Sequence, residues 1–260
     1  MANKSKVEKE LKEIYSPREN RKLWFRGFKK FIRFLNVYKK PETIYLGNRF
    51  KRGSLIISNH VGSYGPLTLE LHTELPVRFW GTYEMNSGLR SAYKYQTNIY
   101  YHEKKGWNIH LARLFCLIAT PITCLFYKGL NLISTYRDAR FVKTIHESIN
   151  AIRRGESVIV FPEDSREGYF DELKSFYAGF VMLAETCYKR GIDLPIYITY
   201  LNRKAGKYMV DAPVCYSELA NLNKSRTELA EMLLNRCNEL GKMSKGEIAQ
   251  STEEKSVKRA

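Results

Sequence analysis

FVKTIHESINAIRRGESVIVFPED, residues 141–164, joins a helix pattern to a strand pattern and then to a polar loop. Its first part, Phe141–Arg153, is predicted to be an amphipathic helix, because Phe141, Ile145, Ile149 and Ile152 recur at helical spacing on one face. Gly155 is a stop signal for that helix. The run 157–161, rich in β-branched residues, is typical of a strand that is buried on both faces of a parallel sheet. The spacing therefore predicts a helix–strand unit with a polar loop, 162–166, after the strand.

The same alternation continues on both sides of this unit. Strand-like runs cover 55–57, 131–135, 194–200 and 208–213, and helix-like runs cover 178–190 and 225–240. Strands that alternate with helices indicate a mostly parallel sheet. The chain has 260 residues, of which 44% are hydrophobic. We therefore predict an α/β fold, a single domain over residues 41–241 with a mostly parallel sheet flanked by helices. The aromatic and polar stretch 77–110 fits no period.

The two ends of the chain differ in composition from this domain. Residues 1–20 form a charged segment without an apolar run, which is not the pattern of a secretory signal. Residues 242–260 are rich in Lys, Glu and Ser, and we expect this tail to be disordered. The five cysteines form no CxxC pair, and their odd number indicates reduced thiols in a cytosolic compartment.

The formal net charge of +16 and the pI of about 9.6 favour anionic partners. Nucleic acid, phosphorylated small molecules and an anionic membrane surface all fit that charge. The cations cluster on one amphipathic segment and no nucleic-acid motif is present, so we expect no nucleic-acid partner. The sequence shows no nucleotide-type phosphate loop, no dinucleotide turn and no metal-ligand spacing. We therefore expect no metal and no bound cofactor.

Residues 21–40, RKLWFRGFKKFIRFLNVYKK, carry a mostly aromatic stripe at helical spacing: Trp24, Phe25, Phe28, Phe31, Ile32, Leu35 and Tyr38. Lys and Arg occupy most of the remaining positions, and Pro41 ends the pattern. We predict an amphipathic helix at a membrane interface, where rings are buried among lipids and cations meet anionic headgroups. The alternative is an ordinary surface helix that packs this stripe on the domain.

The most apolar stretch, residues 111–134, has Pro121 near its middle and one cation toward each end, Arg113 and Lys128. Its uninterrupted part, 114–127, is shorter than the roughly 20 residues that a membrane-spanning helix needs. We expect either a buried core helix or an interfacial segment here, in preference to a transmembrane helix.

Three strand-like runs are followed by unusual polar residues: Asn59-His60, Arg137-Asp138 and the segment 161–166. Loops at the carboxyl ends of parallel strands meet in one crevice, so we expect these side chains to lie together. A histidine can take the proton of a hydroxyl group, and arginine binds phosphate bidentately. The set suits transfer of a group to a hydroxyl of a phosphorylated substrate. Taken singly, each piece also has a plainer explanation: a structural histidine, a surface ion pair, or a strand end with its helix cap.

These loops belong to a series of segments between residues 54 and 200: NHVGSYG (59–65), LISTYRDAR (132–140), FPEDSR (161–166), LKSFYAGFVMLA (173–184) and LPIYITY (194–200). The series resembles the motifs of the glycerolipid, or lysophosphatidic acid type, acyltransferase family. That family has Asn-His, four residues and Asp in its first motif, and roughly Phe-Pro-Glu-Gly-Thr-Arg in its third. Lys174, Phe176 and Gly179 match the family's Leu-Lys-x-Phe-x-x-Gly run.

The resemblance implies a membrane-associated enzyme of phospholipid biosynthesis. His60 would activate the free hydroxyl of a lysophospholipid such as lysophosphatidic acid, which attacks the thioester of acyl-CoA or acyl carrier protein. Arg137, Glu163 and Arg166 would bind the phosphorylated acceptor. We also expect Asn59 and Lys174 to contribute to substrate binding. No cofactor is implied beyond the thioester co-substrate, and the enzyme would lie on the cytoplasmic face of the cell membrane, peripheral or monotopic.

One departure from the family pattern bears on catalysis, because Gly65 stands where the first motif has Asp. That carboxylate would orient the imidazole of His60, and in serine proteases the loss of such a partner costs about 10⁴ in rate. Three alternatives are open. The chain could be a catalytically impaired relative that still binds lipid, or a slow enzyme in which a backbone carbonyl or a hydroxyl (Ser63 or Tyr64) holds the imidazole. In the third, a carboxylate from another part of the chain orients the imidazole. Asp164, where the family has Gly, is our candidate for the last. It could instead simply cap its loop, and Glu70 and Glu74 are weaker candidates.

Overall fold

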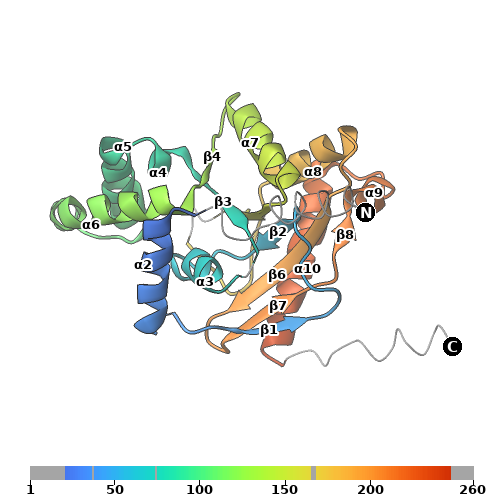
Figure 1. The fold of residues 1–260 in the computed structure, drawn as a ribbon, viewed down its shortest axis with the longest axis horizontal. Helices are drawn as coiled ribbons and strands as arrows, with labels where there is room; N and C mark the ends of the chain where they lie inside the picture. The colour runs from blue at the N-terminus through green and yellow to red at the C-terminus, as the bar shows by residue number, and fades with distance from the viewer. Residues whose placement is uncertain (1–20, 37, 74, 165–167, 247–260) are drawn as a thin grey trace, which may run out of the picture.

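The computed structural model describes residues 21–246 except 37, 74 and 165–167. The charged segment 1–20, most of the expected tail, Glu74 and Arg166 therefore lie outside the described residues. Within them, eight strands form one sheet in the order β1-β7-β6-β2-β5-β3-β4, with β8 paired to β6 (Figure 1). The strands are β1 Glu42–Tyr45, β2 Leu55–Ser58, β3 Val77–Thr82, β4 Ile133–Thr135, β5 Ser157–Val160, β6 Pro195–Asn202, β7 Lys207–Val210 and β8 Val214–Cys215.

The sheet is mostly parallel, as the sequence predicts. The five strands β6, β2, β5, β3 and β4 run parallel to one another, while β7 and β8 are antiparallel to β6. Strands β2 and β5 are buried at every position, which explains why their sequences are continuous apolar runs rather than alternating ones. The predicted strands near β2, β4, β5, β6 and β7 are all present, whereas β1, β3 and β8 were not predicted.

The helices are α2 Leu23–Phe34, α3 Tyr64–His72, α4 Tyr83–Asn86, α5 Leu89–Lys94, the π-helix η1 Tyr95–Lys104, α6 Ile109–Leu130, α7 Phe141–Arg153, α8 Gly179–Lys189, α9 Tyr216–Ala220 and α10 Arg226–Ser244. They cover both faces of the sheet (Figure 1). Alternate residues of each central strand belong to two separate cores. The core with Leu55 and Val158 includes α7, α8 and α10, and the core with Ile56 and Ile159 includes residues of α2, α3 and α6.

Two sequence expectations need correction. Helix α10 continues to Ser244, beyond the expected start of a disordered tail at residue 242. Ser244 is buried and accepts a hydrogen bond of 2.8 Å from the side-chain amide of Asn202, so this end of the helix belongs to the domain.

The second correction concerns the apolar stretch 111–134. Residues 111–130 of this stretch belong to one helix, α6, of 22 residues that runs through Pro121, and strand β4 begins at Ile133. Most of the large apolar side chains of α6 are exposed, so it is not a buried core helix. Within the described residues it is the one helix that is long and apolar enough to cross a membrane, by length and composition.

Helix α2 lies on the domain through ion pairs and through part of its aromatic stripe. Arg21 and Lys29 both bind the carboxylate of Glu70 in α3, at 2.8 and 2.7 Å, and this carboxylate is 1% exposed. Arg33 donates to the carbonyl of Leu71. Of the stripe, only Phe25 is fully buried, and its ring packs on Gly129 of α6. The structure therefore packs part of the stripe on the domain, at Phe25, and leaves Trp24 and Phe31 exposed.

The buried cluster around Glu70 predicts a large loss of stability in Glu70→Ala. The substitution removes the buried carboxylate that Arg21 and Lys29 share, and we expect the free energy of unfolding to fall by about 3–5 kcal/mol. Denaturant unfolding measures the change. Glu239→Ala is the control because Glu239 belongs to a half-exposed pair with Arg236, and such pairs contribute about 1 kcal/mol or less. Equal losses in the two variants would contradict the prediction.

Candidate active site

The first residue after strand β2 is held by hydrogen bonds to strand β6. The side-chain amide of Asn59 donates to the carbonyl of Leu201 at 3.1 Å and accepts from its N–H at 2.7 Å. These bonds extend the pairing of β2 with β6 by one residue and fix the point where His60 leaves the sheet. Asn59 was expected at the substrate, but it is 3% exposed and the structure uses its amide to position the loop.

The imidazole of His60 lies between two aromatic rings. Tyr169 stacks on it with centroids 4.9 Å apart, and Phe161 is tilted against it at 5.0 Å. Burial lowers the pKa of His60 to about 4, although hydrogen bonding to the backbone of Gly62 opposes this fall, and the charge of Lys104 lowers the pKa further. The ring is therefore neutral at pH 7, the state in which an imidazole can accept a proton. Its Nδ1 is buried and has no hydrogen-bond partner among the described residues.

Glu163 connects the loop after β5 to the loop of His60. Its carboxylate is mostly buried and accepts a hydrogen bond of 3.2 Å from the backbone N–H of His60. Burial raises the pKa of Glu163, while the N–H groups of His60 and Phe170 and the charge of Lys104 oppose this rise. The backbone of Glu163 also bridges Phe176 in antiparallel fashion, supported by a bond of 2.8 Å from Tyr177 N–H to the Pro162 carbonyl. The two halves of the sequence motif, FPED and LKSFYAG, are thus physically paired.

The chain after His60 turns too tightly for a side chain at position 65. A Cβ on Gly65 would lie 2.4 Å from the carbonyl oxygen of His60, well inside van der Waals contact. Val61 and Gly62, between them, both have positive φ angles of 42° and 60°. The aspartate of the family motif is therefore absent together with the space that it would need.

None of the proposed substitutes for that aspartate bonds to the imidazole among the described contacts. The charge of Asp164 opposes the fall in the pKa of Lys104. The backbone N–H of Asp164 donates to the carbonyl of Ser175. Glu70 is excluded, because both of its oxygens bind the cations of α2. The relocated-partner role of Asp164 stays a prediction that no described contact supports.

The two hydroxyl candidates also have other contacts. Ser63 hydrogen-bonds the phenol of Tyr100 and so lowers the pKa of that tyrosine, although burial raises it overall. The ring of Tyr64 lies beneath the guanidinium of Arg203, 4.5 Å away. Neither side chain is described as a partner of the His60 ring.

Lys104 belongs to this site, although the sequence pattern did not identify it. It is the last residue of η1 and is half-buried. The pKa of Lys104 is lowered by burial and by the charge of Arg137, and the charges of Asp164 and Glu163 oppose this fall in part. The charge of this amine acts on His60 and Glu163, and the charge of Arg137 acts on the amine. That the three loops form one substrate site stays a prediction. π-Helices are rare and are often found at functional sites, and they follow neither of the two periods that reveal helices and strands in a sequence.

The remaining expected substrate residues lie toward the surface. Arg137 is exposed, with its guanidinium 5.9 Å from the ring of Tyr177. Lys174 is exposed, with its amine 4.1 Å from the ring of Phe170. Among the described side chains, no three His, Cys, Asp or Glu residues gather as metal ligands would.

The described residues thus define a mixed α/β domain with a histidine and a carboxylate at the carboxyl ends of adjacent parallel strands. No protein-family model and no curated protein matches the chain. Among solved structures, it is similar to the crystal structure of PlsC, the 1-acyl-sn-glycerophosphate (LPA) acyltransferase from Thermotoga maritima. The identity is 15%, the TM-score is 0.49, and the match covers 87% of this chain and 81% of that one. What this chain does is therefore inferred from its own residues.

The tight turn at Gly65 predicts that Gly65→Ala destabilises the fold. The new methyl group must displace the His60 carbonyl, and we expect the free energy of unfolding to fall by about 1–3 kcal/mol, as overpacking generally does. Gly27→Ala in α2 is the control, because nothing lies within 4 Å of its added Cβ, and loss of a helical glycine stabilises by about 0.5–1 kcal/mol. A Gly65→Ala protein as stable as wild type would show that the turn can open.

The buried imidazole predicts a pH dependence of stability. Between pH of about 4 and about 6.5, the unfolded chain binds a proton at His60 that the folded chain does not. The free energy of unfolding should therefore fall as the pH falls through this window, and His60→Gln should remove that part of the slope. The imidazole titration, followed by NMR, should have its midpoint near 4, and Lys104→Gln should raise it. A midpoint near 6.5 in the folded protein would contradict the assigned environment.

Proposed function

We propose that the protein is an acyltransferase that moves a fatty acyl group from acyl-CoA or acyl carrier protein to the free hydroxyl of a lysophospholipid such as lysophosphatidic acid. The observation that carries the proposal is the pairing of His60 with Glu163 across the ends of β2 and β5. This hydrogen bond joins the Asn-His segment, whose imidazole is neutral, to the Phe-Pro-Glu segment. Both segments resemble the acyltransferase motifs.

In the proposed reaction, His60 takes the proton of the acceptor hydroxyl while the hydroxyl oxygen attacks the thioester carbonyl carbon. The tetrahedral intermediate collapses with cleavage of the carbon–sulfur bond, and the imidazolium returns its proton to the departing thiolate. A pKa of about 4 makes the imidazole a weak base but the imidazolium a strong acid. The environment of His60 thus favours expulsion of the thiol more than activation of the hydroxyl. Glu163 positions the loop through the backbone N–H of His60.

The cations near His60 are proposed to bind the phosphate of the acceptor. Arg137 is exposed at the mouth of the site and can form two parallel bonds to a phosphate. Lys104 adds a second positive charge close to His60 and Glu163. Arg166 and Lys174 are proposed as further contacts from the loop after β5. No metal or other cofactor is required by this chemistry.

The substrates of such an enzyme lie in a bilayer, and we propose that α2 docks the protein on the anionic, cytoplasmic face of the cell membrane. Phe31 and Phe34 of α2 are 57% and 84% exposed. Lys22 and Lys30 of the same helix are also exposed. Rings that enter the headgroup region and cations that meet anionic lipid are the two components of interfacial binding.

A second candidate function, a catalytically impaired lipid-binding protein, is favoured by the surroundings of Nδ1. This nitrogen has no hydrogen-bond partner among the described residues, and the turn at Gly65 excludes a carboxylate at that position. A third, nucleic-acid binding, is favoured by net charge alone. Salt-sensitive sedimentation with anionic liposomes, without a shift of duplex or single-stranded nucleic acid, would exclude it.

The acyl-transfer proposal predicts that His60→Ala lowers turnover by about 10²–10⁴, the usual contribution of a general base. The assay supplies acyl-CoA or acyl carrier protein and a panel of lysophospholipids in detergent. His146→Ala is the control, because His146 is an exposed histidine on α7, and it should keep wild-type activity. Folding is checked for each variant by circular dichroism and thermal unfolding.

Asp164→Asn in the same assay tests the relocated-partner hypothesis. Loss of activity in both Asp164→Asn and His60→Ala would support a catalytic role for each. Loss in His60→Ala alone would keep the enzyme and eliminate the Asp164 role. Absence of wild-type turnover with every donor, together with tight liposome binding, would establish the lipid-binding alternative instead.

A further inference from the structure

We propose that α6 lies in the plane of the membrane with its outward face among lipid acyl chains, and that it forms with α2 one continuous apolar surface, here called the α2–α6 face. This face consists of the exposed apolar side chains of the two helices. The docking of this face does not depend on the proposed reaction, so the two can fail separately.

The two sides of α6 differ in size of side chain rather than in polarity. A stripe of small residues at four-residue spacing is buried against the domain: Ala112, Cys116, Thr120 and Cys124. The opposite side carries large apolar residues that are 63–74% exposed, namely Leu111, Leu114, Ile118 and Ile122. The exposed side of a helix in water is normally polar, and an apolar area of this size usually marks an interaction surface.

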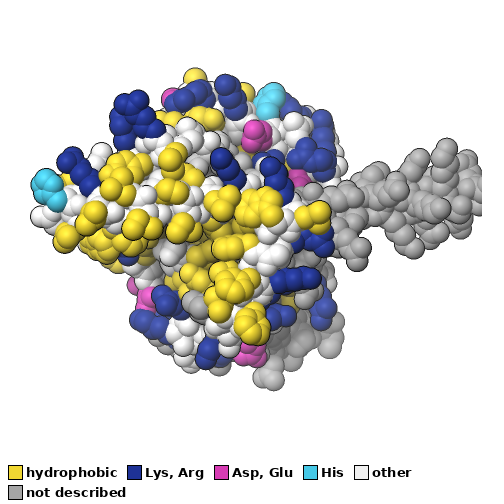
Figure 2. Space-filling view, turned by 60° about the vertical axis from the view of Figure 1, so that its left-hand side comes forward, with side chains coloured by type: hydrophobic (Ala, Val, Ile, Leu, Met, Phe, Trp, Pro, Cys, Tyr) yellow, Lys and Arg dark blue, Asp and Glu magenta, His cyan; other side chains and the backbone are white. Residues whose placement is uncertain are grey.

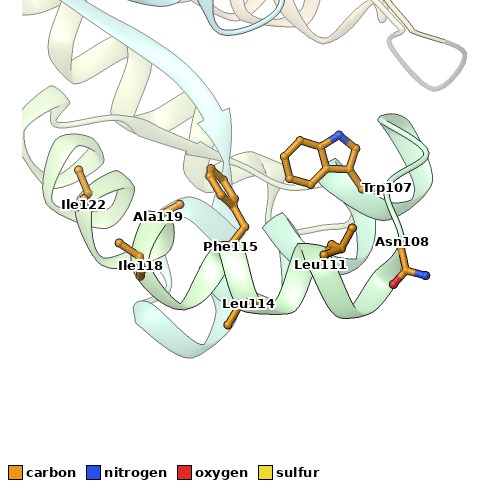
Figure 3. Close-up of a pocket in the computed structure, with 8 residues that line it drawn as sticks. All are labelled: Trp107, Asn108, Leu111, Leu114, Phe115, Ile118, Ala119 and Ile122. Carbon is orange, nitrogen blue, oxygen red and sulfur yellow. The ribbon is translucent and has the colours of Figure 1, made fainter.

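The outward side of α6 forms a shallow hollow of about 810 Å³ that is lined almost entirely by apolar side chains. Trp107 stands at one end of this hollow and Ile122 at the other, with Phe115 between them (Figure 3). The helix contains no acidic residue. Apart from Asn108 and the indole N–H of Trp107, the side chains that line the hollow offer no hydrogen-bonding group to a polar partner.

Aromatic contacts connect the two helices into one face. Phe28 of α2 lies 6.0 Å from Phe126 of α6, and Phe25 lies 5.5 Å from the same ring. The exposed side chains of α2, among them Trp24 and Phe31, thus continue the apolar surface of α6. Figure 2 shows a broad hydrophobic area over these helices, with Lys and Arg side chains around it.

The charges that border this face favour lipid over a second copy of the chain. Lys22, Lys30, Lys105 and Arg113 are all exposed on α2 or near the start of α6. Two copies that met through this face would bring cationic borders together, whereas anionic headgroups would neutralise them. Trp107, 41% exposed, contacts the ring of Tyr101 at 4.9 Å. Aromatic rings beside lysine at a helix end are typical of the boundary between lipid and water.

The packing of α6 shows why it would lie in the plane of the membrane instead of crossing it. A helix of 22 residues measures about 33 Å, enough to cross the hydrocarbon layer. However, the small-residue stripe packs on the domain from Ala112 to Cys124, so one side of the helix is covered along most of its length. Strand β4 begins at Ile133, directly after α6, and η1 ends at Lys104, just before it. A crossing would place these two parts of one domain on opposite sides of the bilayer.

This orientation brings the candidate active site to the level of the lipid headgroups. Lys104 lies five residues before the first residue of α6 and acts electrostatically on His60 and Glu163. With α6 among the acyl chains, Lys104 and Trp107 mark the headgroup boundary. His60 would then face the layer that holds the hydroxyl and phosphate groups of lysophospholipids.

Vesicle binding of the full chain tests the proposal. The probe is vesicles of phosphatidylcholine and phosphatidylglycerol, without acyl donor, at low and at high salt. Leu114→Glu/Ile118→Glu places two charges on the α2–α6 face. Val142→Glu/Leu222→Glu is the matched control, since Val142 and Leu222 are 53% and 47% exposed apolar residues outside that face. At high salt, where the cationic contribution is screened, we expect the first pair to lower partitioning by about a hundredfold or more and the control to leave it unchanged.

Tryptophan fluorescence with lipids brominated along their acyl chains gives a second measurement. Trp107 is one of three tryptophans, and the difference between wild type and Trp107→Phe isolates its signal. Quenching of Trp107 by the brominated chains supports insertion of α6. Absence of quenching, or vesicle binding of Leu114→Glu/Ile118→Glu equal to the control, would overturn the proposal. A lipid-independent dimer that dissociates on introducing those two charges, with no vesicle binding by wild type, would also overturn it and assign the face to self-association.

Discussion

The buried carboxylate of Glu70 determines how the N-terminal helix is placed. A carboxylate that is 1% exposed needs counter-charges, and Lys29 of α2 and Arg21, just before that helix, supply them. This requirement turns one cationic edge of α2 inward, while Phe31 and Phe34 stay exposed. Glu70 belongs to α3, the helix that begins directly after the His60 loop. One ionic cluster therefore fixes both the outward face of α2 and the helix that supports the candidate active site.

The His60 loop is positioned through its backbone instead of through a partner for the imidazole. The N–H of His60 bonds to Glu163, its carbonyl is closely approached by Gly65, and Asn59 is tied to β6. The ring itself is held by stacking with Tyr169 and Phe161. Stacking restricts the plane of a ring but does not select which nitrogen carries the proton. A site of this kind keeps a histidine in a fixed place while giving up the control of its tautomer that a carboxylate would provide.

The parts of the structure that follow a regular period could be predicted from the sequence. Helix α7 has the bounds that were predicted, Phe141–Arg153, because its apolar residues repeat at helical spacing. The contact between the loops of His60 and Glu163 follows β2 and β5, which are parallel neighbours, while the place of Arg137 beside them stays a prediction. The stretch 77–110 could not be assigned, since η1 is a π-helix and its key residue, Lys104, stands in no recognisable motif. The orientation of α2 could not be predicted either. The aromatic stripe can be read from a short segment, whereas Glu70, which binds Arg21 and Lys29, lies 49 and 41 residues away from them in the sequence.

The α2–α6 face and the candidate site are connected at two places. This connection bears on the free energy needed to bring a proposed lipid substrate to His60. Helix α2 is tied to the His60 loop through Glu70 and α3, and α6 is tied to Lys104 through η1. A lysophospholipid that had to leave the bilayer would lose about 0.8 kcal/mol for each buried methylene group of its chain. An active site at headgroup level avoids this loss, because the acceptor hydroxyl can reach His60 while the acyl chain stays in the leaflet. In this proposal the exposed apolar face and the buried imidazole are parts of one arrangement, in which the first would bring the second to the layer that contains the proposed substrate.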